Sequence, residues 1–183
     1  MRARLIAAAG AVATLISAVG SAAAQDTIKI GFVAEYSGIF ADLGRKLDEG
    51  IKLYIKLHGD TIAGKKVEII NRDVGGPLPD VAKRLTQELV TRDKVDILAG
   101  FLSTPVAVAS APIATQAKKP MLLVQAATSG ITARSPYVAR LSYTRGQVAA
   151  PLGTWAAKNG IKTVFTFVAD YGPGFDAEAA FAK

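Results

Sequence analysis

Cysteine is absent from this chain of 183 residues, and histidine occurs once. Without cysteine the chain can form no disulfide, no thiolate metal site and no cysteine nucleophile, and it cannot carry a lipid on an N-terminal cysteine. One histidine cannot make a multi-histidine zinc site. We therefore expect no resident metal and no cofactor, and these absences favour a protein that binds over one that catalyses.

The excess of positive charge is modest and scattered. Lysine and arginine number 22 against 15 aspartate and glutamate, for a formal charge of +7, and half of all residues are hydrophobic. Basic and acidic residues alternate along the chain without long blocks of one sign. Nucleic-acid binding requires a basic stripe with interleaved aromatics, so we expect no nucleic-acid partner. The composition is that of a folded domain with solvated helix faces.

The first 24 residues have the three parts of a secretory signal. Residues 1–4 are basic, residues 5–19 are uncharged and mostly apolar, and small residues lead up to Ala24. This pattern predicts export with cleavage after Ala24. A membrane anchor is the alternative, but the apolar run is short for spanning a bilayer, so we expect no stable membrane insertion after cleavage. An exported chain without cysteine indicates the bacterial periplasm.

Beyond the signal, short apolar runs alternate with segments of helical periodicity. Turn residues bound each run, and most of the helical segments carry one apolar stripe. The predicted strands are 27–34, 66–71, 95–99, 121–124, 137–141 and 163–168, and the predicted helices are 42–58, 80–92, 106–117, 148–159 and a last helix from near Phe175 to the end of the sequence.

Two of these helices carry further expectations. Residues 106–117 are nearly all small and apolar, which predicts burial on most sides, with a kink at Pro112. In the helix 148–159, the residues expected to face inward are Val148, Leu152, Trp155 and Ala156.

The alternation of helices with continuously apolar strands predicts an α/β fold, a doubly wound parallel sheet covered by helices on both faces. Ligands bind such sheets just beyond the carboxyl ends of the strands. The loops expected at that edge are residues 35–38, 100–104, 125–129 and 170–172. Three of them combine small residues with hydroxyl groups, which suit a carboxylate when they lie beside the free N–H groups of a helix start.

Each of these loop residues also has a purely structural interpretation. Hydroxyl residues at helix starts can be N-caps and nothing more, and aromatic residues can be packing residues at the rim of the sheet. The hydroxyl residues concerned are Ser37, Ser103, Thr104 and Ser129, and the aromatic residues are Tyr36, Phe101 and Tyr171. The functional interpretation gains weight because all four loops are expected on one edge.

Catalytic patterns are weak in this sequence. His58 falls at the far end of the helix 42–58, away from the loop hydroxyls, and the chain has no Gly-x-Ser-x-Gly elbow, so a Ser-His-Asp hydrolase is disfavoured. Residues 172–177 fit the Gly-x-Gly-x-x-Gly/Ala pattern of dinucleotide binding, but they follow the sixth predicted strand instead of the first. We interpret them as a turn and a helix start.

Four segments of the chain, taken in order, resemble one family. They are IKIGFVAEYSGIFADLGRKLDEGIKLYI with the KVEII strand that follows, ILAGFLSTPVAVASAPIA, PMLLVQAATSG and VFTFVADYGPG. Together they resemble the periplasmic solute-binding proteins of ABC importers, of type I fold, in the branched-chain amino acid and amide-binding (leucine-binding protein-like) group. The resemblance covers nearly all of the chain after residue 24.

This resemblance implies a two-lobed protein that closes on a small-molecule solute between its lobes and presents it to a membrane permease. The solute would be an amino acid, an amide or an aromatic acid, held by its carboxylate. The residues implied as ligand contacts are Phe101, Leu102, Ser103, Thr104, Ala126, Ala127, Thr128 and Tyr171, with Tyr36 and Ser37 bordering the cleft. The alternatives are a ligand sensor of the same fold that feeds a receptor or regulator and, from another class, an exported enzyme.

Members of this family are longer than this chain and cross between the lobes more than once. Here one crossing is expected, near residues 141–145, so residues 25–141 form the first lobe and residues 142–183 an incomplete start of the second. We therefore expect a fragment or a truncated reading frame. The apolar side chains that would then form an exposed patch are Trp155, Val164, Phe165 and Phe167.

Overall fold

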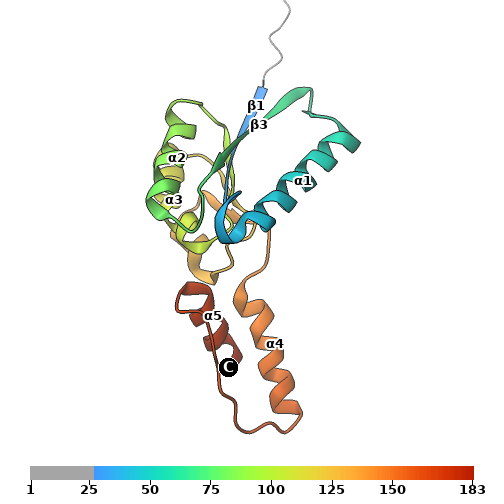
Figure 1. Cartoon of the computed structure of the whole chain (residues 1–183), viewed down its shortest axis with the longest axis vertical. Coiled ribbons are helices and arrows are strands. Elements are labelled where there is room, and N and C mark those ends of the chain that lie inside the picture. Colours follow the sequence, from blue (N-terminus) through green and yellow to red (C-terminus); the bar gives the residue numbers. More distant parts are fainter. Residues whose placement is uncertain (1–26) are drawn as a thin grey trace, which may run out of the picture.

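The computed structural model describes residues 27–183, so the predicted signal and its cleavage after Ala24 lie outside the described residues. A sheet with helices against it forms one part, and a pair of helices projects from that part (Figure 1). The strands are β1 (Thr27–Ala34), β2 (Thr61–Ile62), β3 (Lys65–Asp73), β4 (Ile97–Gly100), β5 (Met121–Leu123) and β6 (Val138–Arg140). The helices are α1 (Ala41–His58), α2 (Pro79–Thr91), α3 (Thr104–Ala117), α4 (Arg145–Lys158) and α5 (Gly172–Phe181), with short 3-10 helices η1 (Gly38–Phe40) and η2 (Ser129–Arg134).

The six strands form one sheet in the order β2-β3-β1-β4-β5-β6. β1 pairs in parallel with β3 and β4, and the parallel ladder continues through β5 to β6. Only β2 pairs antiparallel, with β3. The predicted doubly wound, mainly parallel sheet is confirmed. β2 is missing from the sequence prediction because two residues show no period; they turn into β3 through Ala63 and Gly64, both with positive φ.

Helices cover both faces of the sheet. Successive residues of β1 point to opposite faces, so neighbouring residues of this strand show which helices pack on each face. On one face, Phe32 belongs to a cluster against which Leu47 of α1 packs. On the other face, Val33 belongs to a larger cluster with Leu89 of α2 and Val106 of α3. Figure 1 shows the same division, with α1 on one side and α2 and α3 on the other.

The burial predicted for the third helix is confirmed. Six of the 14 residues of α3 are buried, among them Ala107 and Ala114. Pro112 lies inside the helix, which runs from Thr104 to Ala117 without a break. The expected kink at Pro112 stays a prediction. Within residues 27–183, no helix combines the length and the apolar character needed to cross a membrane.

The predicted strand 163–168 is wrong. Residues 161–169 form neither helix nor strand, and Phe165 and Phe167 are 91% and 96% exposed. A strand needs a neighbour for its backbone hydrogen bonds, and the sheet of the described residues ends at β6 without pairing to this segment. Residues 163–168 have a sequence that favours a strand, but they have no neighbouring strand to pair with among the described residues.

The inward face predicted for the fourth helix is right at one position and wrong at three. Ala156 is 6% exposed, whereas Val148, Leu152 and Trp155 are more than half exposed. α4 packs on α5 along its other side, where a β-carbon at Gly153 would lie 2.2 Å from the Phe181 carbonyl oxygen. Val148, Leu152 and Trp155 are exposed because no strand of the described residues packs against them.

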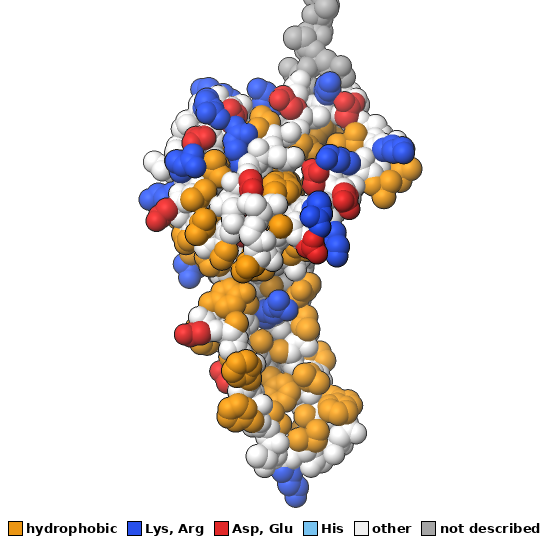
Figure 2. All heavy atoms as spheres, viewed as in Figure 1, with side chains coloured by type: hydrophobic (Ala, Val, Ile, Leu, Met, Phe, Trp, Pro, Cys, Tyr) orange, Lys and Arg blue, Asp and Glu red, His pale blue; other side chains and the backbone are white. Residues whose placement is uncertain are grey.

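The exposed apolar patch expected near the end of the chain is confirmed. Trp155 and Val164 are about half exposed, and Phe165 and Phe167 almost fully. Figure 2 shows hydrophobic side chains gathered over the projecting part, while charged side chains are spread over the part that holds the sheet.

The last helix differs from its prediction at both ends. α5 begins at Gly172, earlier than the predicted start near Phe175, and ends at Phe181 before the end of the chain. Pro173 in its first turn explains the early start, because the fixed φ of proline suits the first residues of a helix and its missing N–H has no helical partner to lose.

Candidate functional site

The carboxyl ends of β1 and β4 form the topological switch point of the sheet. The chain passes from β1 to β3 on one side and then returns to β4 on the other side of β1. Ligands of open α/β sheets bind at this crevice. The residues that follow the two strands are Glu35–Ser37 after β1 and Phe101–Thr104 after β4, so the first two predicted loops lie here side by side.

Phe101 and Leu102 turn the chain at this edge with their side chains in the core. Phe101 is fully buried in the α2/α3 cluster, and Leu102 is 4% exposed in the α1 cluster. Phe101 has a φ of 62°; its N–H donates to the Val33 carbonyl at 2.6 Å, and its own carbonyl accepts from the Ala126 N–H at 3.0 Å. Both side chains are therefore packing residues. These two residues can contribute mainly backbone groups to a site at this edge.

Ser103 and Thr104 bring hydroxyl groups to the start of α3. Ser103 occupies the N-cap position, yet its side chain makes no capping bond, and its buried Oγ has no hydrogen-bond partner among the described residues. Thr104 Oγ1 lies 2.8 Å from Thr128 Oγ1, so a hydrogen bond joins the loops after β4 and β5. The N-cap interpretation of Ser103 is thus not confirmed, and its hydroxyl makes no hydrogen bond of normal geometry within the described residues.

Glu35 is a candidate site residue that the predicted contact residues leave out. It is fully buried, and neither carboxyl oxygen has a hydrogen-bond partner in the described part of the chain. Burial raises the pKa of Glu35 above its ordinary value. The Ser103 hydroxyl and the N–H groups of Leu102 and Ser103 are near enough to oppose this pKa shift without reversing it. One feature of the sequence could have identified Glu35, namely an acidic residue directly after a buried apolar strand.

The loop after β1 is fixed by Asp73 at the end of β3. The Asp73 carboxylate accepts hydrogen bonds from the Tyr36 N–H at 2.9 Å, from Ser37 Oγ at 2.7 Å and from the Gly75 N–H at 2.8 Å. The Tyr36 hydroxyl donates to Asn71 Oδ1 at 3.1 Å. Ser37 therefore bonds to Asp73 and does not cap η1.

Tyr36 stays protonated at any physiological pH. Burial raises its pKa to about 12, and the negative charges of Asp48 and Asp73 act in the same direction. The Tyr36 hydroxyl is therefore a hydrogen-bond donor and acceptor at this edge, and it carries no charge of its own.

The loop after β5 is held from behind by Arg140. Ala126 and Ala127 are 1% and 5% exposed. The Arg140 guanidinium donates to the carbonyls of Ala126 and Thr128, and the Arg145 N–H donates to the Ala127 carbonyl at 2.9 Å. Ala126 and Ala127 thus belong to a buried backbone segment held by hydrogen bonds. Thr128 is half-buried, and its hydroxyl lies beside that of Thr104.

The start of α5 lies against the same edge. A β-carbon at Gly172 would be 2.9 Å from Thr128 Oγ1 and 3.6 Å from the Thr104 methyl carbon, so the residue next to Tyr171 touches both threonines. Tyr171 itself is 38% exposed. Of the ten predicted contact residues, the structure brings together Ser103, Thr104 and Thr128, and it places Tyr171 next to them through its neighbour Gly172. It holds Tyr36 and Ser37 beside Asp73.

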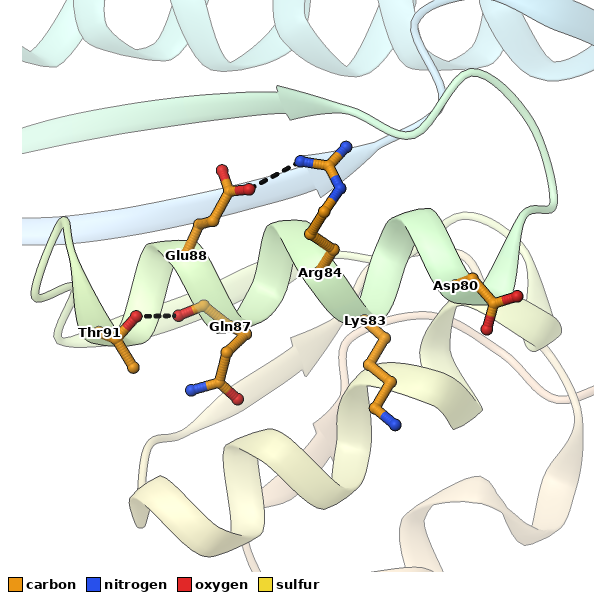
Figure 3. A pocket seen from close by; sticks show the side chains of 6 residues that line it. All are labelled: Asp80, Lys83, Arg84, Gln87, Glu88 and Thr91. Atoms are coloured by element: carbon orange, nitrogen blue, oxygen red, sulfur yellow. Dashed lines mark hydrogen bonds and ion pairs between the residues drawn. The ribbon is translucent and has the colours of Figure 1, made fainter.

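The cavities of the described residues include two that lie away from this edge, on α2 and beside α1. One of about 390 Å³ is an open depression along α2, where Arg84 pairs with Glu88 at 2.7 Å (Figure 3). The other, of about 210 Å³, lies between the end of α1 and strands β1 and β3, with Tyr54 and Ile62 among its lining. His58, at this far end of α1, stacks near Tyr54, with ring centroids 4.6 Å apart. No group of three or more potential metal ligands occurs in residues 27–183.

Comparisons with known proteins agree with this geometry. Residues 27–183 match the periplasmic binding protein family. Leu/Ile/Val-binding protein homolog 6 of Brucella abortus (strain 2308) is 43% identical over 167 residues, which are 91% of this chain and 43% of that protein.

Two solved structures are similar over 86% of this chain and 43% of their own length. One is a solute binding protein of an ABC transporter from Rhodopseudomonas palustris BisB5 in complex with 3,4-dihydroxybenzoic acid, with 53% identity and a TM-score of 0.83. The other is an ABC transporter solute binding protein from R. palustris in complex with 4-hydroxybenzoate, with 43% identity and a TM-score of 0.82. This chain spans less than half the length of these relatives. With its mainly parallel sheet and its match over residues 27–183, the chain belongs to the periplasmic binding protein family.

Proposed function

We propose that this chain contributes the first lobe of a solute-binding component of an ABC importer, and that its solute is a small aromatic acid. The observation that carries the proposal is the Ser103 hydroxyl at the uncapped start of α3, which makes no hydrogen bond of normal geometry within the described residues and lies next to the bonded pair Thr104 and Thr128. These groups lie at the topological switch point, where α/β sheets bind their ligands.

A carboxylate is the ligand group that this edge suits best. The N-terminus of a helix carries partial positive charge and N–H groups without helical partners. Ser103 does not occupy those N–H groups, since its side chain makes no capping bond. A solute carboxylate can accept hydrogen bonds from the helix start and from the Ser103 and Thr104 hydroxyls together.

The aromatic class comes from the relatives. The two solved structures described above hold 3,4-dihydroxybenzoic acid and 4-hydroxybenzoate at 53% and 43% identity. We therefore place an aromatic acid ahead of an amino acid or an amide.

We assign residues 25–141 to the first lobe and residues 142–183 to the start of the second. The solute would lie between the two lobes, next to Ser103 and Thr104. The Tyr171–Gly172 turn of the second lobe borders this place, because Gly172 contacts Thr104 and Thr128. In the periplasm, the loaded protein would present the solute to a membrane permease, after removal of the signal at Ala24.

A thermal-shift screen of the full chain tests this function. The panel is 4-hydroxybenzoate, benzoate and leucine, with glucose as an uncharged control. A ligand that binds only the folded state raises the melting temperature with its concentration. We expect the two aromatic acids to give a concentration-dependent rise and glucose to give none. A rise with leucine alone would contradict the aromatic class, and no rise with any carboxylate would contradict the function.

A further inference from the structure

Glu35 lies directly behind the hydroxyl that we assign to the solute carboxylate. It follows β1, and Ser103 follows β4, the parallel neighbour of β1. Glu35 is fully buried and Ser103 is 4% exposed, and both Glu35 oxygens and Ser103 Oγ lack a hydrogen-bond partner in the described residues. The Ser103 hydroxyl is near enough to the Glu35 carboxyl to lower its pKa, so these three buried polar atoms lie close together without a hydrogen bond of normal geometry, although buried polar atoms are nearly always satisfied in native proteins.

The protonation state of Glu35 decides what Ser103 can offer to a solute. A hydroxyl has one proton to donate and two lone pairs to accept with, whereas an ionised carboxylate only accepts. If Glu35 is ionised, it draws the Ser103 proton toward itself, and the lone pairs of Ser103 and the charge of Glu35 both repel a solute carboxylate. If Glu35 is protonated, its O–H can donate to Ser103 Oγ, and the Ser103 proton is free for the solute.

We propose that Glu35 is a positioning residue that binds a proton from solvent when the solute carboxylate binds, donates its O–H to Ser103 Oγ and so directs the Ser103 hydroxyl at the solute. This inference rests on the proposed function. Its ligand class is therefore the same, a small anion with a carboxylate.

The surroundings of Glu35 favour the neutral form. Burial raises its pKa, and the only opposing influences are the Ser103 hydroxyl and nearby backbone groups. Two carboxylates of the neighbouring elements bond elsewhere: Asp73 of β3 with Tyr36 and Ser37, and Asp48 of α1 with Lys52. The start of α3 contributes the Ser103 hydroxyl, and Gly44 of α1 packs on the Glu35 carbonyl. Within residues 27–183, no cationic side chain is among the groups that lower the Glu35 pKa.

Calorimetric titration of the full chain with 4-hydroxybenzoate tests the inference. Titrations are run from about pH 5.5 to about pH 7.5, where the solute carboxyl is ionised and its phenol is neutral. Two buffers of different ionisation enthalpy give the number of protons bound. We expect uptake of up to about one proton per solute, with affinity falling by up to about tenfold per pH unit above the Glu35 pKa of the free protein.

The variant Glu35→Gln separates positioning from mere packing, because its amide N–H₂ can donate to Ser103 without titrating. We expect it to bind the solute with no proton uptake and with an affinity that does not change with pH. Glu35→Ala should bind at least about tenfold more weakly, since it leaves Ser103 without a donor behind it. Glu49→Gln, at an exposed carboxylate of α1, is the control and should keep the wild-type proton uptake.

The outcomes distinguish the inference from the function. Solute binding without proton uptake in the wild-type chain, or with the same pH profile in Glu35→Gln, would overturn the inference and leave the function intact. If Glu35→Gln does not fold by circular dichroism, the wild-type proton count decides alone. A wild-type chain that binds no aromatic acid would overturn the function and the inference together.

Discussion

Asp176 of α5 accepts two hydrogen bonds from Ser129, one from its backbone N–H at 3.0 Å and one from its hydroxyl at 2.6 Å. Ser129 begins η2, just after the loop that follows β5. The two residues thus join the first and second parts of the chain next to Thr128, one of the threonines at the candidate site. This contact fixes where the start of α5 lies relative to the sheet.

Replacing Asp176 by alanine should loosen this junction. Both Ser129 donors lose a charged acceptor in a half-buried place, so we expect the free energy of unfolding to fall by about 1–2 kcal/mol. Urea denaturation of the full chain, followed by circular dichroism, measures the change. Asp170→Ala is the matched control, because Asp170 is exposed and makes no side-chain hydrogen bond that the structure of residues 27–183 records. Equal effects of both variants would contradict the role of Asp176.

Asp73 should make stability depend on acid pH. Burial alone would raise its pKa, but hydrogen bonds from Ser37, Gly75 and Tyr36 outweigh burial and lower the pKa below its ordinary value. A carboxyl with a lowered folded pKa contributes stability above its unfolded pKa and loses that contribution as pH falls through the folded value. The loss therefore falls below about pH 4.

The variant Asp73→Asn isolates this contribution. It should be less stable than wild type at neutral pH, and the difference should shrink as pH falls below the ordinary aspartate pKa of about 4 and the wild-type carboxyl becomes protonated. Urea denaturation of both proteins across this range measures the difference. A gap that stays constant with pH would show that the ionised carboxylate of Asp73 is not what holds the loop after β1.

A pair of glycine substitutions tests the packing of the start of α5. A β-carbon at Gly174 would lie 1.9 Å from the Ala169 carbonyl oxygen, whereas at Gly50 of α1 it would meet nothing within 4 Å. We expect Gly174→Ala to destabilise the chain by about 1–3 kcal/mol through overpacking. Gly50→Ala should stabilise it by about 0.5–1 kcal/mol, since alanine is the better helix former. Melting temperatures that move in the same direction for both variants would contradict this local geometry.

The fold could be predicted from the sequence wherever burial and local pattern agree. Residues 27–34 are apolar and β-branched, and they form β1 between two parallel neighbours that satisfy their backbone. Residues 163–168 have a similar pattern and form no strand, because a strand depends on partners that local sequence does not contain. For the same reason Val148, Leu152 and Trp155 follow a helical stripe and yet are exposed.

At the site, the loops could be predicted and the roles within them could not. The alternation of strands and helices places residues 35–37 and 101–104 at one edge, as the structure confirms. Which side chains turn inward depends on backbone torsion, and the positive φ of Phe101 sends its ring into the core. The burial of Glu35 and the bond between Thr104 and Thr128 arise from contacts between loops far apart in sequence.

The central claim is that the Ser103 and Thr104 hydroxyls hold the carboxylate of an aromatic acid. Its most direct test is calorimetric titration of the full chain with 4-hydroxybenzoate, in wild type and in Ser103→Ala, Thr104→Val and the control Thr91→Ala. Thr91 donates its hydroxyl to the Gln87 carbonyl on α2, away from the edge. We predict that the two site variants each weaken binding by about 1–3 kcal/mol and that the control does not. Unchanged affinity in both site variants would contradict the account.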